Sequence, residues 1–498
     1  MSFRPALLAL FLSGAAAAQQ QPPETSGVGG QNQPNASGTG SAAFSDPSQL
    51  FSGQAGAYIG VAFTKIGSEG TYASTIISTE FSLGPLGVGL ALPLNLMIWN
   101  NDKCCDGQTT RDSKTYSGLI RKRDWIEPQD YLKLVRFLRC GHKRDPVYFL
   151  AGQLWGASIG HGTLVSRYSN SLSLDHPKLG LALDLDSTFV GIETLTDFVA
   201  DPTLLGTRVY LRPFGDTPFA RGWAVGFTFV TDRHAPRALQ YLADGVTIDQ
   251  DAAGNPRVAA SDAVYAGGID TEFEVLRNSI ISLIPYVDLN RIAGAGNGLH
   301  AGILTDIYFP IPFLELNLQA RLEYRVMQPG YIPEYFDQTY DVGRVQYAVG
   351  SGASTVWRPK IIAAQDAHNS ARDPSAIDRK GYYGELAFGF FGLLQIGGLY
   401  QDYEGDANGA SLGLFVVFPK LNLIKLSAYY LRKNMKSGFD DAFTLDERSL
   451  LAAAVAYKMF GPIYMRAEFQ RQWALEPGAT QVKAIDKFSA GIATFIAF

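Results

Sequence analysis

Apolar and polar residues alternate strictly along the segment from residue 314 to residue 325. The apolar positions are Leu314, Leu316, Leu318, Ala320, Leu322 and Tyr324, and the positions between them are Glu315, Asn317, Gln319, Arg321, Glu323 and Arg325. Because strand side chains point to opposite faces with a period of two, this pattern predicts a strand with one apolar wall and one charged wall. A half-buried sheet of a soluble protein shows the same pattern, so this segment alone predicts only a strand with one wet face.

Similar runs of roughly ten residues recur from Ala55 to the end of the chain, as in the segments 205–212, 263–275 and 463–471. The breaks between runs are of two kinds. Short breaks occur at 84–85, 277–278, 310–311, 391–392, 419–420 and 461–462. Long polar breaks occur at 99–129, 158–176, 233–261, 327–378 and 434–446.

This alternation of tight turns and long loops is typical of a bacterial outer-membrane barrel. Counting back from the C-terminus puts the long breaks outside the cell, provided that residues 131–140 form a strand. The pattern therefore predicts an all-β fold: a single transmembrane antiparallel up-and-down barrel of about 20 strands, within a range of about 16 to 20. Its expected extent is 53–498, with short periplasmic turns and long extracellular loops.

Composition agrees with this fold and excludes others. The mean hydropathy is 0.00, as expected when lipid-facing and lumen-facing residues cancel. The longest apolar run, Leu83 to Trp99, is interrupted by Pro85 and Pro93 and is not a transmembrane helix. With a formal net charge of -5, the chain is not expected to bind nucleic acid.

The N-terminus predicts export. Residues 1–18 have a cationic start at Arg4, an apolar core and small residues ending in Ala16-x-Ala18, which is the pattern of a secretory signal peptide. Residues 19–52 are rich in Gln, Pro, Gly, Ser and Asn and are expected to form a flexible periplasmic leader.

The last strand carries the most specific signal. Phe488, Ala490, Ile492, Thr494, Ile496 and Phe498 form one face, with Ser489-x-Gly491 between them. This resembles the C-terminal assembly signal of Gram-negative outer-membrane β-barrel proteins, although Thr494 departs from it where a larger apolar residue is commoner. The resemblance implies an outer-membrane location, with Gly491 and Phe498 in the signal. Its expected partners are the barrel-assembly machinery, outer-membrane lipid and lipopolysaccharide.

The polar faces of the strands supply the candidates for the lumen. They are Arg208, Arg212, Asp270, Glu272, Glu274, Glu315, Asn317, Gln319, Arg321, Glu323, Arg325, Arg466 and Glu468. A barrel of this size has room for a water-filled pore. We therefore predict a porin-like channel for passive diffusion of small hydrophilic solutes. The alternative is a plugged structural, adhesive or lipid-modifying barrel without a general pore.

Residues 160–170, with His161 and several serines, form the most motif-like loop. A histidine that activates a serine would be one use of this composition. The other interpretation is a glycine turn that leads into a polar loop folded into the barrel mouth. With no nucleophile elbow and no third orienting residue, the sequence predicts no catalytic site, and the protein is not expected to be an enzyme.

No metal site and no cofactor are predicted. The histidines do not have zinc-site spacing, and the segment from Asp249 to Pro256 lacks the later ligands of a calcium loop, which favours a hairpin turn. A disulfide from Cys104 or Cys105 to Cys140 stays open.

The break at 327–378 is long for a segment without structure, which is typical of functional loops. Two interpretations remain open: a loop that folds into the lumen and narrows it, or an extracellular cap that packs on itself. Oligomeric state does not follow from the sequence.

Overall fold

The computed structural model describes residues 55–67, 70–100, 120–121, 124–126, 128–141, 143, 145–172, 178–215, 217, 222–251, 254–311, 314–350, 355–391, 393–418, 423–436, 438–476 and 478–497. The predicted signal peptide and leader, and the terminal Phe498, lie outside these ranges.

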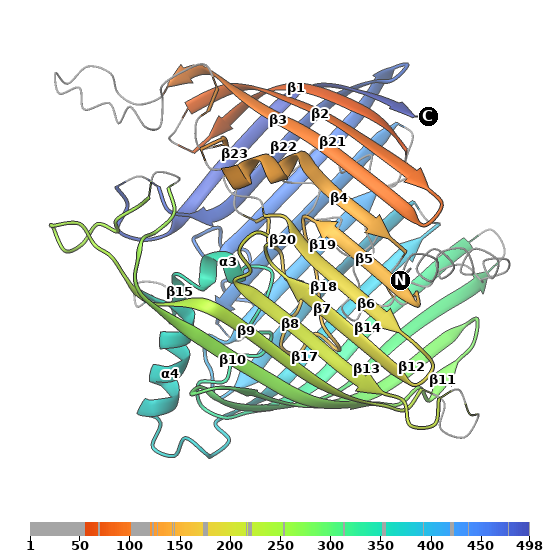
Figure 1. Ribbon diagram of the computed structural model, residues 1–498, viewed down its shortest axis with the longest axis vertical. Helices are drawn as coiled ribbons and strands as arrows, with labels where there is room; N and C mark the ends of the chain where they lie inside the picture. The colour runs from red at the N-terminus through yellow and green to blue at the C-terminus, as the bar shows by residue number, and fades with distance from the viewer. Residues whose placement is uncertain are drawn as a thin grey trace, which may run out of the picture.

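The strands form one antiparallel sheet that closes on itself (Figure 1). They are β1 (Gly56–Ile66), β2 (Gly70–Leu83), β3 (Leu86–Asn100), β4 (Val135–Cys140), β5 (Val147–Gly152), β6 (Gly180–Asp186), β7 (Val190–Thr196), β8 (Leu204–Leu211), β9 (Ala224–Leu239), β10 (Val258–Glu272), β11 (Leu276–Arg277), β12 (Ile281–Ile292), β13 (Gly296–Ile311), β14 (Leu314–Met327), β17 (Arg379–Phe390), β18 (Leu394–Glu404), β19 (Ala410–Phe418), β20 (Ile424–Met435), β21 (Ser449–Phe460), β22 (Ile463–Ala474) and β23 (Lys483–Ala497).

Closure of the ring comes from β1 and β23, which pair from Gly56 opposite Ala497 to Ile66 opposite Lys487. The two-residue strand β11 continues β10 along the same partner, β12. Of the 21 strands in the sheet, 20 therefore occupy separate positions in the ring. The predicted barrel of about 20 strands is confirmed.

The two faces of the sheet differ as the sequence pattern predicts. On β14, Leu322 is 55% exposed, whereas Arg321 is 1% and Arg325 0% exposed. On β10, Ile269 is exposed and Asp270 is buried. Among the described residues, none of the helices is both long and apolar enough to cross a membrane.

Residues 131–140 differ from the prediction in part. A 3-10 helix, η4 (Pro128–Leu134), precedes β4, so the strand begins only at Val135. Pro128 suits the first helical position because it has no backbone N–H to leave unpaired, and Asp130 in the first turn suits the N-terminal end. The remaining six residues still form a strand, which preserves the predicted order of inner and outer turns.

Two of the long breaks that the sequence predicts as loops contain secondary structure. The break predicted at 233–261 is strand at both of its ends, because β9 continues to Leu239 and β10 begins at Val258, with register shifts near Val258 and Asp262 in their pairing. The break at 327–378 contains the helices α3 (Tyr340–Gly343) and α4 (Lys360–Ser370) and a hairpin of β15 (Tyr347–Val349) and β16 (Val356–Arg358).

The closing seam generates a prediction at Gly491, which lies opposite Ala62. A side chain there would place its Cβ 2.5 Å from the Cα of Ala62, and backbone cannot yield as a flexible side chain can. We expect Gly491→Val to reduce the folded fraction strongly, measured by heat-modifiable migration in gels. Ile492→Val, on the exposed outer face of the same strand, is the control and should fold normally. A fully folded Gly491→Val protein would contradict the close approach.

Candidate functional site: a constriction formed by two inner segments

Two loops turn inward and meet inside the ring (Figure 1). Inner segment A is residues 153–172, between β5 and β6, and inner segment B is residues 328–346, after β14. Their backbones join through Glu334 N to Thr163 O at 2.9 Å, Phe336 N to Leu164 O at 3.0 Å and Ser166 N to Phe336 O at 3.1 Å. The first part of the 327–378 break therefore enters the lumen, which decides between the two interpretations for that part.

An apolar cluster holds the inner segments together. Residues from both segments and from α4 are buried in it, among them Leu164, Val165, Tyr168, Tyr331, Tyr335, Phe336, Tyr340 and Ile361. Aromatic rings dominate segment B, and the centroids of Phe336 and Tyr340 lie 4.9 Å apart. This cluster fixes the position of the polar groups around it.

Segment A is also held by charge. His161 Nδ1 lies 2.8 Å from Asp288 on β12, and Nε2 lies 2.8 Å from Glu272 on β10. Its ring stacks on Tyr286 with centroids 4.1 Å apart. Because carboxylates occupy both ring nitrogens, His161 does not activate a serine. The Ser/His interpretation is not supported by this geometry, and the alternative of a loop folded into the barrel describes the segment.

The wall opposite segment B carries a buried charge cluster centred on Glu323 of β14. Arg325 Nε donates to its Oε2 at 2.6 Å, and Arg321 Nε donates to its Oε1 at 2.7 Å. Tyr286 donates to Oε1, and His300 Nδ1 lies 3.2 Å from Oε2. The side chain of Glu323 is 0% exposed. Two arginines and hydrogen bonds compensate the cost of burying this carboxylate.

A second group of predicted residues lies on β8 and β10. Arg208 donates to Asp270 from Nε at 3.0 Å and also from Nη2, and its Nη1 donates to Glu193 at 3.1 Å. Glu193 accepts in turn from the backbone N–H of Gly160 in segment A, at 2.8 Å. Ligand atoms of His161, Asp270 and Asp288 lie within 4.8 Å of one another. Because Asp270 already pairs with Arg208, this arrangement is an ion-pair network rather than a metal-binding geometry.

The other predicted lumen residues are spread around the ring. Arg212 pairs with Asp186 at 2.5 Å, Glu274 lies 3.2 Å from Arg277, and Arg466 pairs with Glu468. Asn317 is half-buried and Gln319 is buried on β14. The side chain of Glu315 and residue Phe498 lie outside the description, and Gly491 lies in the closing strand. The structure does not bring all these residues together, and their pore-lining role stays a prediction.

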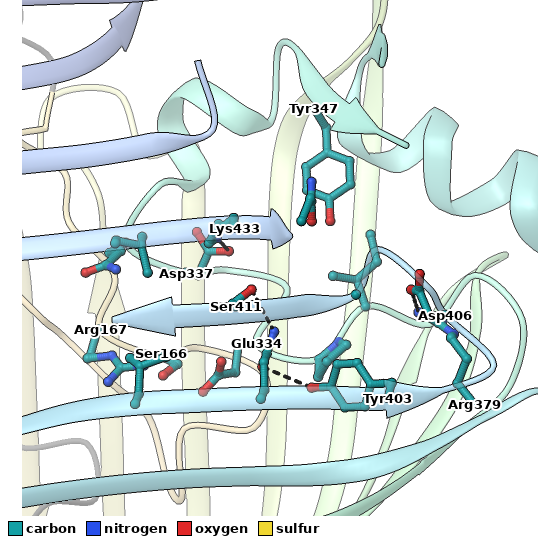
Figure 2. A pocket seen from close by; sticks show the side chains of 18 residues that line it. Ser166, Arg167, Glu334, Asp337, Tyr347, Arg379, Tyr403, Asp406, Ser411 and Lys433 are labelled. Atoms are coloured by element: carbon teal, nitrogen blue, oxygen red, sulfur yellow. Dashed lines mark hydrogen bonds and ion pairs between the residues drawn. The ribbon is translucent and has the colours of Figure 1, made fainter. Parts of the chain in front are cut away.

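A polar cavity lies between the inner segments and the ends of β17 to β20, with a volume of about 90 Å³. Figure 2 shows the side chains around it: Ser166 and Arg167 from segment A, Glu334 and Asp337 from segment B, Tyr347 from β15, and Arg379, Tyr403, Asp406, Ser411 and Lys433 from the strand ends and the turn after β18. Charged groups of both signs face one another across it.

The cations of this lining have ion-pair partners but are not fully enclosed by them. Arg167 donates to Glu385 at 2.6 Å and to Tyr383 at 3.0 Å, yet its side chain stays 22% exposed. Lys433 donates to Asp337 at 2.5 Å and to Thr339 Oγ1 at 2.9 Å. These cations keep some access to the cavity while their positions are fixed.

Lys360 at the start of α4 lies behind this lining. Its Nζ donates to the carbonyl of Tyr335 at 2.6 Å and lies 3.3 Å from Asp337, among the rings of Tyr335, Tyr340 and Tyr347. Burial lowers the pKa of Lys360 to about 8, against the opposing effect of Asp337 and with a smaller contribution from neighbouring Lys433.

Sequence reasoning missed Arg167, Glu334, Arg379 and Lys433 as site residues. Three of them fall outside a clear strand alternation or at its very end, so period-two patterning gave no signal for them. Two weaker signals pointed nearby: the motif-like loop that contains Arg167 and the aromatic run that contains Glu334.

The structure also describes the segment from Asp249 to Pro256 in part, and one of the three cysteines. Asp251 accepts a hydrogen bond from the backbone N–H of Asn255 at 2.8 Å, and Asp249 lies 3.4 Å from Arg257, which is the geometry of a hairpin turn. Cys140 is half-buried in β4, while Cys104 and Cys105 lie outside the described residues. The disulfide therefore stays a prediction.

Comparison with known proteins gives the following. No protein-family model matches the chain, and no curated protein matches it. Among solved structures, Pseudomonas aeruginosa OccK11 (OpdR) is similar at 10% identity over 89% of this chain and 96% of that chain, with a TM-score of 0.31. Pseudomonas aeruginosa OpdL matches at 12% identity over 89% and 99%, with a TM-score of 0.30.

A third solved structure is Wzi, described as a carbohydrate-binding β-barrel of the Escherichia coli outer membrane. It is similar at 9% identity over 91% of this chain and 86% of that chain, with a TM-score of 0.33. Likenesses at these scores carry no argument about function. The class of the protein follows from its own ring: full backbone pairing, an exposed apolar outer face and charges inside define a β-barrel of the bacterial outer membrane.

The Glu323 cluster gives a stability prediction. Glu323→Gln removes one charge and leaves Arg321 and Arg325 buried without it, which costs about 3 to 5 kcal/mol when a buried pair is broken. We expect this loss in the free energy of unfolding, measured by denaturant titration in micelles. Glu404→Gln, at the exposed end of β18, makes the same chemical change and should have little effect. Equal stability of both variants would contradict the cluster's role.

Lys360 gives a pH prediction. Its folded pKa of about 8 lies below the ordinary value of 10.5, so the unfolded chain binds the proton more tightly. As the pH rises from 8 to 10.5, wild type should therefore gain stability relative to Lys360→Met, by about 3 kcal/mol at most. The measurement is denaturant unfolding at several pH values. Lys380→Met, which removes an exposed lysine, is the matched control. A stability difference between wild type and Lys360→Met that stays constant over this pH range would contradict the assignment.

Proposed function

We propose that this protein is a porin-like channel for passive diffusion of small hydrophilic solutes, with its constriction at the cavity between the inner segments. The observation that carries the proposal is the inward fold of both segments, which places partly exposed charges inside a transmembrane ring. A solute crossing the barrel would meet Arg167 and Lys433 there. Charges at the narrowest point of a pore dominate its selectivity.

The rigidity of the constriction supports a sieving role. Segment A is fixed by His161 to two strands, and both segments share one apolar cluster. A loop held in this way keeps the cross-section of the pore constant, whereas a loosely held loop would open and close the pore as it moved. Insertion by the barrel-assembly machinery and a surrounding shell of lipid and lipopolysaccharide are part of the proposal.

A plugged barrel is the second candidate, and the apolar cluster favours it. Large rings from both inner segments are buried with Ile361 of α4 inside the barrel mouth, among them Tyr331 and Phe336 at 0% exposure. Such packing resembles a plug as much as a constriction. A lipid-modifying activity has weaker support, since His161 is bound to carboxylates on both sides.

Planar bilayers distinguish the two candidates. We expect stepwise conductance from the purified protein, and Arg167→Gln should shift the reversal potential in a salt gradient toward cation selectivity. Arg257→Gln removes the same charge from an exposed hairpin and is the matched control, which should leave the potential unchanged. Folded protein that never conducts would refute the channel and favour the plug. Equal shifts in both variants would show that Arg167 does not lie at the constriction.

A further inference from the structure

Strained backbone gathers at the cavity. Four non-glycine residues in the described part of the chain have positive φ, and three of them line this cavity: Arg167 at 49°, Glu334 at 52° and Asn434 at 50°. A positive φ costs conformational free energy in residues other than glycine. It therefore persists only where the surrounding structure enforces it, often at ligand sites. Arg167 and Glu334 come from different inner segments and still meet at the same cavity.

Lys433 of the lining shares its carboxylate partner with Lys360, a second ammonium group that lies behind the lining. Asp337 is the carboxylate shared by two ammonium groups, with Lys433 Nζ at 2.5 Å and Lys360 Nζ at 3.3 Å. Three groups in contact therefore carry a net single positive charge. Across the cavity, Arg379 lies 3.5 Å from Asp406, which balances that pair.

The lining also contains an acceptor without a donor. Oε1 of Glu334 accepts no hydrogen bond from the residues that the structure describes, although Glu334 is only 9% exposed. Its nearest cations, Arg325 and Arg321, lie at 3.5 and 3.6 Å, beyond hydrogen-bond geometry. A buried acceptor of this kind is stabilised when a ligand supplies a hydroxyl or N–H.

Neutral hydrogen-bonding groups complete the lining: Ser166, Gln338, Gln401, Tyr403, Ser411 and Asn434. From these observations we propose that the cavity is a binding site for a small hydroxylated monocarboxylate. Its carboxylate would lie at Lys433 and one hydroxyl would donate to Glu334. The proposal rests on the proposed function, since it names the solute class selected at that constriction.

Other solute classes fit less well. An organic cation would lie beside Lys433 and Arg379, and the ammonium of a zwitterion would approach Glu334 where Arg167, Arg321 and Arg325 already cluster. A carboxylate without hydroxyl groups would satisfy Lys433 but leave the Glu334 acceptor empty. A polyol without a carboxylate would leave the surplus charge unbalanced.

Calorimetric titration of the detergent-solubilised full chain tests the site without requiring conduction. Four six-carbon probes isolate each requirement: gluconate, hexanoate, glucitol and glucosamine. We expect gluconate to bind about tenfold more tightly than each of the others, because it alone makes both the charge-assisted contact and the donation to Glu334. Hexanoate binding as tightly as gluconate, or glucosamine binding more tightly, would overturn the proposal.

Variants locate the site. Lys433→Met should weaken gluconate binding about tenfold, while Lys433→Arg retains the charge and should retain most of the binding. Glu334→Gln should reduce the preference for gluconate over hexanoate. Lys380→Met is the control at an exposed lysine outside the cavity and should bind as wild type does. Unchanged gluconate binding in folded Lys433→Met would overturn the assignment.

The outcomes separate this inference from the channel. Gluconate binding by protein that stays silent in bilayers would refute the channel and retain the site. Conducting protein without a preference for gluconate would retain the channel and refute the site.

Discussion

Backbone pairing around a closed ring is the constraint on which the rest of the structure depends. In a membrane no water is present to satisfy an open sheet edge, so the first and last strands must pair with each other. Here β1 pairs with β23 along all of β1, and Gly491 allows a close approach at Ala62. Once the ring is closed, the alternation of apolar and polar residues decides which face of each strand contacts lipid and which faces the interior. For most positions the period matters more than the particular residue, and Gly491 is an exception.

On the inner face of the ring, charged side chains are buried and need partners. Ion pairs supply these partners at two places. Glu323 lies between Arg321 and Arg325 on one wall, and His161 reaches from inner segment A to two carboxylates on neighbouring strands. The ion pairs do more than neutralise the wall, since several of them end on the inner segments. The same interactions that make buried charge tolerable also fix the position of the inner segments.

The cavity brings together two carboxylates with incomplete pairing. Glu334 keeps one oxygen without a hydrogen bond, and Asp337 is shared by two lysines. The strained φ angles of Arg167 and Glu334 occur at the same place. Strained backbone and incompletely paired carboxylates therefore occur together at this cavity, as expected when binding groups are held ready rather than paired with one another.

The sequence by itself determined the barrel, the approximate strand number, the inner and outer faces, and the polar wall that includes Arg321, Glu323 and Arg325, because all of these follow from a local period of two. It placed the start of β4 too early, since a proline-initiated 3-10 turn has no period-two signature. Only the tertiary structure decided that inner segments A and B enter the lumen and bring Arg167 against Glu334, residues far apart in the chain. Contacts of that kind depend on where a loop packs after the ring has closed, and no local pattern encodes that position.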